Sequence, residues 1–261
     1  MAITDTKELA KGYTAVNNTQ FNAGLFLIRT LGSLAGNKVL DVGCGTGNLT
    51  NHLRELVGKD GSVIGIDPST ERIAIAQEFK QPNLSFEVGQ AEDLSRFSSG
   101  TFDVVFVNST FHWVQDQPKA IREFSRVLKS GGRLGISGGS GDFVAIHEKI
   151  KEDVLSREPY RQYPEQGGPT FIKQQDLEGL LDQAGFSERK IVVNTILKTA
   201  KDGAEMVEWL DTSSSGATYG GIPLDMRPKA REEMLVEWAK VTTKEGIRMP
   251  MDLLVTVAVK D

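Results

Sequence analysis

The chain contains little cysteine, with a single residue, Cys44, in 261. One thiol cannot form an intramolecular disulfide, and it cannot supply the several thiolates of a cysteine-based metal site. Both kinds of cross-link are therefore excluded, although a chain of this length can bury a full hydrophobic core without them. Scarce cysteine also suits a reducing compartment.

The chain also lacks concentrated positive charge. Its formal net charge is -5 and no run of lysine and arginine stands out, so the electrostatic surface expected of a nucleic-acid-binding protein is missing. No apolar stretch approaches the roughly 20 residues that span a bilayer, and the first ten residues do not resemble a signal peptide. We therefore expect a soluble, cytoplasmic protein with neither nucleic acid nor a membrane as its partner.

What the sequence does contain is the composition of a globular protein, with 39% hydrophobic and 25% charged residues. Short aliphatic runs alternate with segments of helical periodicity, which is typical of a parallel sheet with crossover helices. Strands are predicted at 38–42, 62–66, 84–88, 102–107, 133–136, 191–197 and 253–259. Helices are predicted at 49–57, 69–79, 118–128 and 177–184. The sequence thus predicts an α/β fold with seven strands.

A glycine-rich loop, D-V-G-C-G-T-G at 41–47, follows the first predicted strand. Glycine lets the backbone turn tightly and approach a ligand closely, and amides at a helix start can face negative groups. Asp67 ends the second strand, where dinucleotide-binding folds place a carboxylate against ribose hydroxyls. The loop alone also fits a turn without a ligand, but together with Asp67 it predicts a site for a nucleotide-like cofactor.

The spacing of the glycines separates two kinds of cofactor. Nicotinamide sites use G-x-G-x-x-G, whereas Gly43, Gly45 and Gly47 give G-x-G-x-G with an acid two residues before the first glycine. The Tyr-x-x-x-Lys pair of common short-chain dehydrogenases is also missing. With the F-D-V-V-F-V strand and the K-S-G-G-R-L turn, residues 38–136 closely resemble the class I S-adenosylmethionine-dependent methyltransferases. That resemblance implies a seven-stranded Rossmann-like sheet flanked by helices, with a helical and loop cap.

The resemblance also suggests how the chain is divided. Two glycine-rich and serine- or proline-rich segments, 138–172 and 198–250, interrupt the alternation of strands and helices and are interpreted as cap insertions. Within one methyltransferase domain over 1–261, we expect N-terminal lid helices at 1–35 and a cofactor-binding core at 36–137. The remaining core helix and antiparallel strands are expected at 173–197 and 251–261.

The family's cofactor-binding positions can be transferred one by one. They correspond here to Asp41, Gly43, Gly45, Gly47, Asp67, Pro68, Gln90, Ala91, Asn108 and Ser109. By this resemblance the first four hold the methionine moiety, Asp67 the ribose, the next three the adenine, and the last two lie near the sulfonium. The family often has an aspartate at position 90, but the amide oxygen of Gln90 can equally accept a hydrogen bond from the adenine amine.

Residues 108–116, N-S-T-F-H-W-V-Q-D, place His112 and Trp113 at the end of the fourth predicted strand. Ligands of open α/β sheets bind beyond the carboxyl ends of the strands, so we expect both side chains to face the acceptor of the methyl group. A phenol, alcohol or ammonium acceptor must lose a proton, which suits His112 as a general base, whereas a carboxylate needs only orientation. Alternatively, both residues have a structural role in the core.

The residues present narrow the acceptor. Residues 108–111 lack the prolines of methyltransferases that act on amino groups of bases or glutamine, no acidic cluster suggests a catechol-type metal site, and one cysteine disfavours arsenite chemistry. H-W-V-Q and the N-terminal Y-T-A-V-N-N-T-Q resemble enzymes that methylate small carboxylic acids, such as the trans-aconitate and juvenile hormone acid methyltransferases. By that resemblance Gln20 and Trp113 grip the carboxylate and Tyr13 closes over the cofactor.

In the first cap insertion, Tyr160 and Arg161 are further candidates for binding an acidic substrate, because arginine pairs bidentately with carboxylates. Trp209 and Trp238 lie on helical patterns and are predicted to form the core of the cap. The sequence therefore predicts methylation of a small molecule from S-adenosylmethionine, with a carboxylate oxygen as acceptor and no metal. Amine or phenol methylation, a cyclase that keeps the fold, and a cofactor-binding module remain as alternatives, and the sequence does not distinguish a monomer from a homodimer.

Overall fold

The computed structural model describes residues 6, 18–164, 168–214 and 217–261. These residues belong to two compact units. The α/β unit comprises 20–142, 170–194 and 253–261, and the cap unit comprises the described residues of 1–19, 143–169 and 195–252. The two internal segments of the cap unit lie close to the predicted insertions at 138–172 and 198–250.

The chain alternates strands and helices as the sequence predicts. The strands are β1 (Lys38–Val42), β2 (Ser62–Asp67), β3 (Leu84–Val88), β4 (Phe102–Asn108), β5 (Leu128–Gly139), β6 (Glu188–Ala200) and β7 (Ile247–Val259). The helices are α2 (Asn18–Leu31), α3 (Asn48–Val57), α4 (Thr70–Ala76), α5 (Gln117–Val127), α6 (Ile146–Leu155), α7 (Gln174–Gln183), α8 (Gly203–Ser213) and α9 (Arg227–Val241). Single 3-10 turns are η1 (Gln77–Phe79), η2 (Phe111–Trp113), η3 (Tyr160–Gln162), η4 (Ala217–Tyr219) and η5 (Leu224–Met226).

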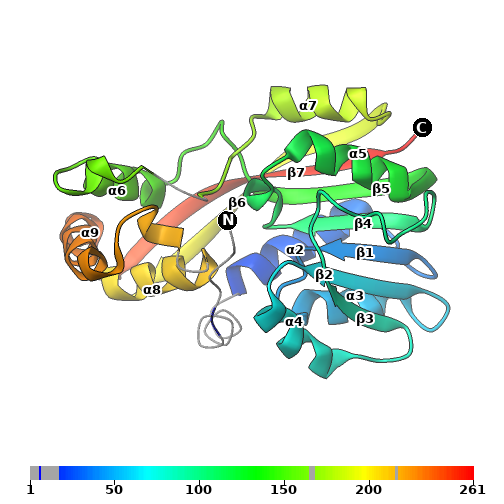
Figure 1. Cartoon of the computed structure of the whole chain (residues 1–261), viewed down its shortest axis with the longest axis horizontal. Coiled ribbons are helices and arrows are strands. Elements are labelled where there is room, and N and C mark those ends of the chain that lie inside the picture. Colours follow the sequence, from blue (N-terminus) through cyan, green and yellow to red (C-terminus); the bar gives the residue numbers. More distant parts are fainter. Residues whose placement is uncertain (1–5, 7–17, 165–167, 215–216) are drawn as a thin grey trace. The chain divides into compact units, whose positions relative to one another are not determined.

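The seven strands form one sheet in the order β3-β2-β1-β4-β5-β7-β6 (Figure 1). The first five in this order pair in parallel, and β7 pairs with β5 in the antiparallel direction. The chain order reverses between β1 and β4, because β2 and β3 lie on one side of this point and β5 on the other. Ligands of open α/β sheets bind at such a reversal, beyond the carboxyl ends of the strands. The seven-stranded fold of the class I methyltransferases is thereby confirmed.

The α/β unit has hydrophobic cores on both faces of its sheet. On β4, Val104 and Phe106 belong to the core under α2, α3 and α4, whereas Val105 and Val107 belong to the core under α5 and α7. All four side chains are fully buried. A strand that is buried on both faces reads as a continuous apolar run, and burying each such side chain contributes about 1.5–3 kcal/mol. These cores hold the carboxyl ends of β1 and β4 side by side.

The cap unit has its own core, to which α6, α8 and α9 contribute. Trp238 is 0% exposed and Trp209 is 6% exposed, so the prediction that both form the core of the cap is confirmed. At the end of α6, Arg157 donates a 2.7 Å hydrogen bond to Glu237 of α9, and this ion pair ties the two helices together.

The last two strands are longer than predicted, at 13 residues each. Pro250, which cannot donate a ladder hydrogen bond, disfavours a strand at this position, yet it lies within β7 and is exposed. In β6 exposed and partly exposed residues alternate, so its ends carry few of the apolar residues from which strands are recognised. The polar ends of β6 and Pro250 in β7 explain why the sequence predicted only 191–197 and 253–259.

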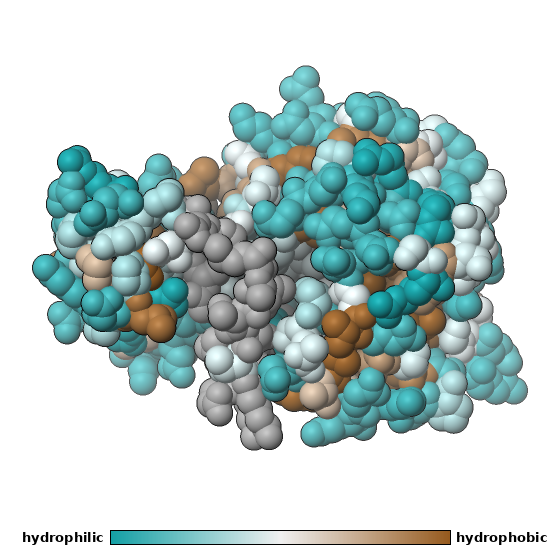
Figure 2. Space-filling view, viewed as in Figure 1, coloured by the Kyte–Doolittle hydropathy of each residue, from teal (hydrophilic) through white to brown (hydrophobic). Residues whose placement is uncertain are grey.

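The surface of the α/β unit is largely hydrophilic on the face turned to the viewer, and hydrophobic residues form smaller groups within it (Figure 2). Scattered apolar residues of this kind are normal on folded proteins. Within the described ranges, no helix combines the length and the apolar character needed to cross a membrane.

Candidate active site

The glycine loop after β1 adopts a conformation that only glycine accepts easily. Gly43, Gly45 and Gly47 have positive φ angles of 78°, 55° and 87°. A Cβ at Gly43 would lie 2.1 Å from Oγ1 of Thr110, which is closer than atoms can approach. The amides of Gly43 and Cys44 donate to the carbonyl of Ile66 at 2.8 and 3.0 Å. The loop is therefore held against the end of β2 and leaves little room for a side chain at Gly43 or Gly47.

Asp41 lies at the start of this loop with a buried carboxyl group. The hydroxyl of Thr50 donates to its Oδ2 at 2.7 Å, and only 3% of the residue is exposed. Burial raises the pKa of Asp41 to about 7; the bond from Thr50 lowers it, and the nearby charge of Asp67 raises it further. A positively charged group placed beside Asp41 would favour its ionised form.

Asp67 ends β2, and its carboxylate contacts the glycine loop. Oδ2 accepts a hydrogen bond from the amide of Gly45 at 3.0 Å, and Oδ1 accepts one from the amide of Ser69 at 2.9 Å. Pro68 is exposed next to it. The two oxygens of a carboxylate together offer about four acceptor positions. The structure thus brings together the two motifs from which the sequence predicted a cofactor site.

The end of β4 lies beside the glycine loop that follows β1. Oγ1 of Thr110 lies 3.4 Å from the carbonyl of Gly43 and donates to the carbonyl of Asn108 at 2.9 Å, and Nδ2 of Asn108 donates to the carbonyl of Gln20 at 2.9 Å. Ser109 has a φ of 53°, which is uncommon for a residue other than glycine, and its amide donates to the carbonyl of Ser137 at 2.7 Å. Such strained residues cluster at functional sites, where neighbouring structure holds them in place.

His112 and Trp113 lie on the 3-10 turn that directly follows β4. Both are partly buried, and the imidazole packs against Phe171 with ring centroids 5.2 Å apart and against Trp113 at 5.4 Å. Gly138 of β5 gives the imidazole its space, because a Cβ there would lie 3.2 Å from Nδ1 of His112. The imidazole is therefore held among three neighbours at the predicted edge of the sheet.

The segment that contains Phe171 is fixed to the turn by hydrogen bonds. The amide of Thr170 donates to the carbonyl of His112 at 2.6 Å, and the side-chain amide of Gln117 donates to the carbonyls of Phe111 and Thr170 at 3.1 and 2.9 Å. Sequence reasoning missed Phe171 and Gly138, because both contacts join residues far apart in the chain and neither residue belongs to a local motif.

Gln90 and Ala91, the residues expected at the adenine, follow β3. Gln90 is exposed, whereas Ala91 is buried. The next residue, Glu92, accepts hydrogen bonds from the amides of Gln115 and Asp116 at 2.9 and 3.4 Å. Glu92 therefore connects the loop after β3 with the segment that follows His112 and Trp113, a link that the sequence did not predict.

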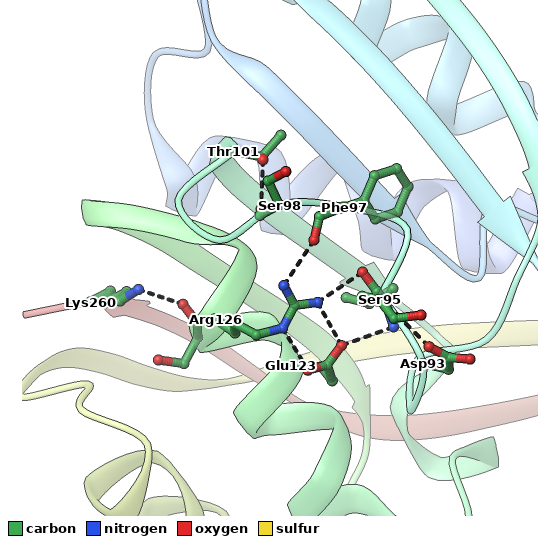
Figure 3. Close-up of polar contacts among 10 residues, drawn as sticks. Asp93, Ser95, Phe97, Ser98, Thr101, Glu123, Arg126 and Lys260 are labelled. Atoms are coloured by element: carbon green, nitrogen blue, oxygen red, sulfur yellow. Dashed lines mark hydrogen bonds and ion pairs between the residues drawn. The ribbon is translucent and has the colours of Figure 1, made fainter.

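A partly buried ion pair on α5 holds the remainder of this loop (Figure 3). The guanidinium of Arg126 pairs with Glu123 at 2.7 Å and donates to the carbonyls of Leu94 and Phe97, each at 2.8 Å. Glu123 in turn accepts a hydrogen bond from the amide of Leu94 at 3.0 Å. Residues 94–97 are thus fixed on α5 by three backbone hydrogen bonds to charged side chains, which are stronger than neutral ones.

The predicted substrate residues fall in different places. Gln20 and Trp113 lie in the α/β unit, where Gln20 contacts Asn108, and their role stays a prediction. Tyr160 is fully buried in the core of the cap unit, where its hydroxyl donates to Glu233 at 2.8 Å. The role of Tyr160 in substrate binding stays a prediction, although its side chain lies in the core of the cap unit. Arg161 is exposed and pairs with Glu158, so its role remains a prediction.

Two further predictions concern Tyr13 and metal ions. Tyr13 lies outside the described residues. In the described part of the chain, no group of three or more histidine, cysteine, aspartate or glutamate side chains is arranged to hold a metal ion.

Comparison with known proteins identifies the family. Residues 40–136 match the methyltransferase domain family. The chain is 31% identical to an uncharacterized methyltransferase of Schizosaccharomyces pombe, with 71% of this chain and 72% of that protein covered. It is 39% identical to a demethylmenaquinone methyltransferase of Lactococcus lactis, with 61% of this chain and 69% of that protein covered. The chain therefore belongs to the class I S-adenosylmethionine-dependent methyltransferases.

A solved structure gives independent support for the fold. The YcgJ protein of Bacillus subtilis superimposes with a TM-score of 0.63 over 92% of this chain and 98% of its own, at 18% identity. At that identity the likeness concerns the fold alone. The particular resemblance to trans-aconitate and juvenile hormone acid methyltransferases stays a prediction.

Proposed function

We propose that this methyltransferase binds S-adenosylmethionine at the carboxyl ends of β1, β2 and β4 and transfers its methyl group to an oxygen atom of a small molecule. The observation that carries this proposal is the meeting of three strand ends. Asp67 bonds to the amide of Gly45, and Thr110 packs on Gly43, so the glycine loop, the ribose acid and the turn with His112 form one edge.

The residues at this edge fit the cofactor. Oδ1 of Asn108 and Oγ1 of Thr46 are buried and have no hydrogen-bond partner among the residues that the structure describes. Buried polar atoms in native proteins are nearly always paired, so these two are available to a ligand. In this assignment the glycine loop and Asp41 hold the methionine moiety, Asp67 accepts from the ribose, and Pro68, Gln90 and Ala91 lie at the adenine. Asn108 and Ser109 lie near the sulfonium, and Tyr13 closes over the cofactor.

S-adenosylmethionine supplies an electrophilic methyl group when it is bound. The chain's own residues then have to hold the acceptor oxygen in line and exclude water. His112, enclosed by Phe171, Trp113 and Gly138, is the side chain in the β4 turn that can exchange a proton near neutral pH.

Our first candidate for the acceptor is a carboxylate. Its support is the H-W-V-Q sequence together with Gln20, whose backbone contacts Asn108 at the end of β4. A carboxylate is already ionised at neutral pH, so His112 and Trp113 would donate hydrogen bonds that orient it. A second candidate is a phenolic hydroxyl group, favoured by an O-methyltransferase of Penicillium expansum that is 30% identical over 71% of this chain; His112 would then accept the hydroxyl proton.

The experiment that tests the function measures release of S-adenosylhomocysteine from S-adenosylmethionine with small acids, phenols and amines. His112→Asn should lower kcat about 100-fold for a phenol, because proton removal is lost, and should mainly raise KM for a carboxylate. The matched control is His52→Asn, a change at a partly exposed histidine of α3 that pairs with Glu55. Full activity of His112→Asn would remove His112 from the mechanism, and conversion without S-adenosylhomocysteine would favour a cyclase.

A further inference from the structure

The cap unit contains two buried nitrogen atoms without a partner. Nε1 of Trp209 and Nδ1 of His147 have no hydrogen bond among the residues that the structure describes. Trp209 is only 6% exposed, so water has little access to its ring. Buried tryptophan N–H groups usually have a partner, and an unsatisfied one in a native structure calls for an explanation.

A lysine shares the surroundings of these two rings. Nζ of Lys198, on β6, lies 5.2 Å from the ring centroid of Trp209, on α8. The ring of His147, at the start of α6, meets the same indole edge to face, with centroids 6.0 Å apart. Three elements of the cap unit thus bring an ammonium, an imidazole and an indole N–H together around one aromatic ring.

The charges around this cluster leave its lysine without a counterion. Burial raises the pKa of Glu148, but the hydrogen bond from His147 and the charge of Lys151 lower this pKa to about 2. Glu148 is therefore ionised. Nε2 of His147 lies 3.1 Å from Glu148, and Lys151 lies 3.4 Å from it. The carboxylate of Glu148 is therefore already paired with His147 and Lys151.

Burial also lowers the pKa of Lys198, and the charge of Glu205 raises it. Glu205 itself accepts a hydrogen bond from the amide of Lys201 at 2.8 Å. No carboxylate within the described ranges lies within ion-pair distance of Lys198. A cation that is partly buried beside an aromatic ring gains from the ring face, but a desolvated ammonium is stabilised much more by an anion.

We propose that His147, Lys198 and Trp209 form a binding site in the cap unit for the carboxylate group of a small organic acid. The ammonium and the indole N–H donate to the carboxylate oxygens. His147, with Nε2 toward Glu148, adds Nδ1 as a third donor in its imidazolium form. The carboxylate belongs either to the methyl acceptor, in which case the site rests on the proposed function, or to a separate small acid.

The site can be tested without cofactor or turnover. In full-length protein with 15N-labelled tryptophan, the indole resonance of Trp209 is assigned as the signal that Trp209→Phe removes. Phenylacetate at about 10 mM, where fragment-sized ligands bind, should shift this resonance, and the uncharged phenylacetamide should not. The indole of Trp238, fully buried in the same unit, is the internal reference.

Substitution of the lysine makes the test specific. Lys198→Met should weaken the response to phenylacetate about tenfold because the charge-assisted bond is lost, Lys198→Arg should restore it, and Lys190→Met, a change at an exposed residue of β6, should leave it unchanged. An unmoved Trp209 resonance, or an equal shift with phenylacetamide, overturns the site even if S-adenosylmethionine binds normally.

The two sources of the carboxylate are separated in the S-adenosylhomocysteine assay. If the acid is the methyl acceptor, Lys198→Met raises KM for that acceptor and leaves kcat unchanged. If it is a separate molecule, added phenylacetate changes the rate of the wild-type enzyme and not that of Lys198→Met. The proposal is contradicted if Lys198→Met leaves KM unchanged and added phenylacetate also leaves the rate of the wild-type enzyme unchanged.

Discussion

Gly138 determines where the imidazole of His112 can lie. A methyl group at position 138 would contact Nδ1 at 3.2 Å, so the ring would have to move by a few tenths of an ångström. Small displacements of a reacting group are costly, since a shift of about 1 Å can lower a rate about 100-fold. Adding one carbon atom at Gly138 therefore tests whether the position of the His112 imidazole matters for catalysis.

We expect Gly138→Ala to lower kcat severalfold, with S-adenosylhomocysteine binding unchanged, as measured by steady-state kinetics and calorimetry. The control is Gly179→Ala in α7, where nothing lies within 4 Å of the added Cβ. That change should raise the free energy of unfolding by about 0.5–1 kcal/mol and leave kcat as it is. A Gly138→Ala enzyme with unaltered kcat would show that the chemistry does not need this position of His112.

At this scale the sequence predicted what local motifs encode. Gly43 and Asp67 could be recognised because a strand, a turn and a second strand place them within 25 residues, and their contact is observed through Gly45. Phe171 and Gly138 could not, because they reach His112 only through tertiary packing. The burial of Tyr160 was not predicted, because an aromatic residue beside an arginine has the same appearance in a binding loop and in a core.

Among the elements, the loop after β3 depends on α5 for its position. Arg126 and Glu123 satisfy three backbone groups of residues 94–97 (Figure 3). Glu92 accepts a hydrogen bond from the segment after His112. The loop is therefore fixed at both ends, and Gln90 and Ala91 lie next to the fixed part. A change on α5 should reach the adenine site without touching the cofactor.

Arg126→Met should lower the free energy of unfolding by about 1–3 kcal/mol, because the carbonyls of Leu94 and Phe97 and the carboxylate of Glu123 lose their donor. We also expect a weaker affinity for S-adenosylhomocysteine, measured by calorimetry. The control is Arg96→Met in the same loop, since Arg96 pairs with Glu87 on the surface and such pairs contribute less than about 1 kcal/mol. Equal losses in both variants would contradict a specific role for Arg126.

The elements themselves followed from hydrophobic patterning where they are buried. The strands β1 and β3 have the predicted bounds, because β1 is a short and mostly buried run, whereas β3 alternates buried residues with more exposed ones. The helix α6 was not predicted at all, since only Ile150 and Val154 of its ten residues are buried and the helical period is weak. A helix that buries few residues shows only a weak apolar periodicity in the sequence.

For the molecule as a whole, Asp41 should make stability depend on pH. Burial raises its pKa from 3.8 to about 7, so between these values the folded protein holds a proton that the unfolded chain releases. Stability contributed at this site is therefore greatest at low pH and falls as pH rises through this window, by up to about 1.4 kcal/mol per pH unit. Above about pH 7 the loss is complete.

Asp41→Asn should remove this slope, which denaturant unfolding at several pH values would measure. The control is Asp103→Asn, because Asp103 makes the free energy of unfolding depend on pH in the opposite direction. Burial raises the pKa of Asp103, but hydrogen bonds from Lys129 and from the amide of Lys38 hold this pKa below its usual range. The stability that ionised Asp103 contributes to the fold is therefore lost as pH falls. The same slope in wild type and Asp41→Asn between pH 4 and 7 would rule out the buried acid.

The division into two units was only partly visible in the sequence. The breaks in the alternation of strands and helices lie near the borders of the cap unit, because insertions disturb the βαβ pattern. The cap's own core could not be assembled from the sequence beyond Trp209 and Trp238, since α6 is far from α8 and α9 in the chain and meets them only in the fold.

The central claim is that the edge formed by β1, β2 and β4 binds S-adenosylmethionine, and calorimetry of the purified protein tests it most directly. S-adenosylmethionine and S-adenosylhomocysteine should bind more tightly than NAD. Asp67→Ala should weaken their binding by about 1–3 kcal/mol, because the ribose donors and the amide of Gly45 lose their acceptor, whereas Asp93→Ala in the exposed loop after β3 should not. Binding of NAD without binding of either sulfur compound, or an affinity that Asp67→Ala leaves unchanged, would contradict the account.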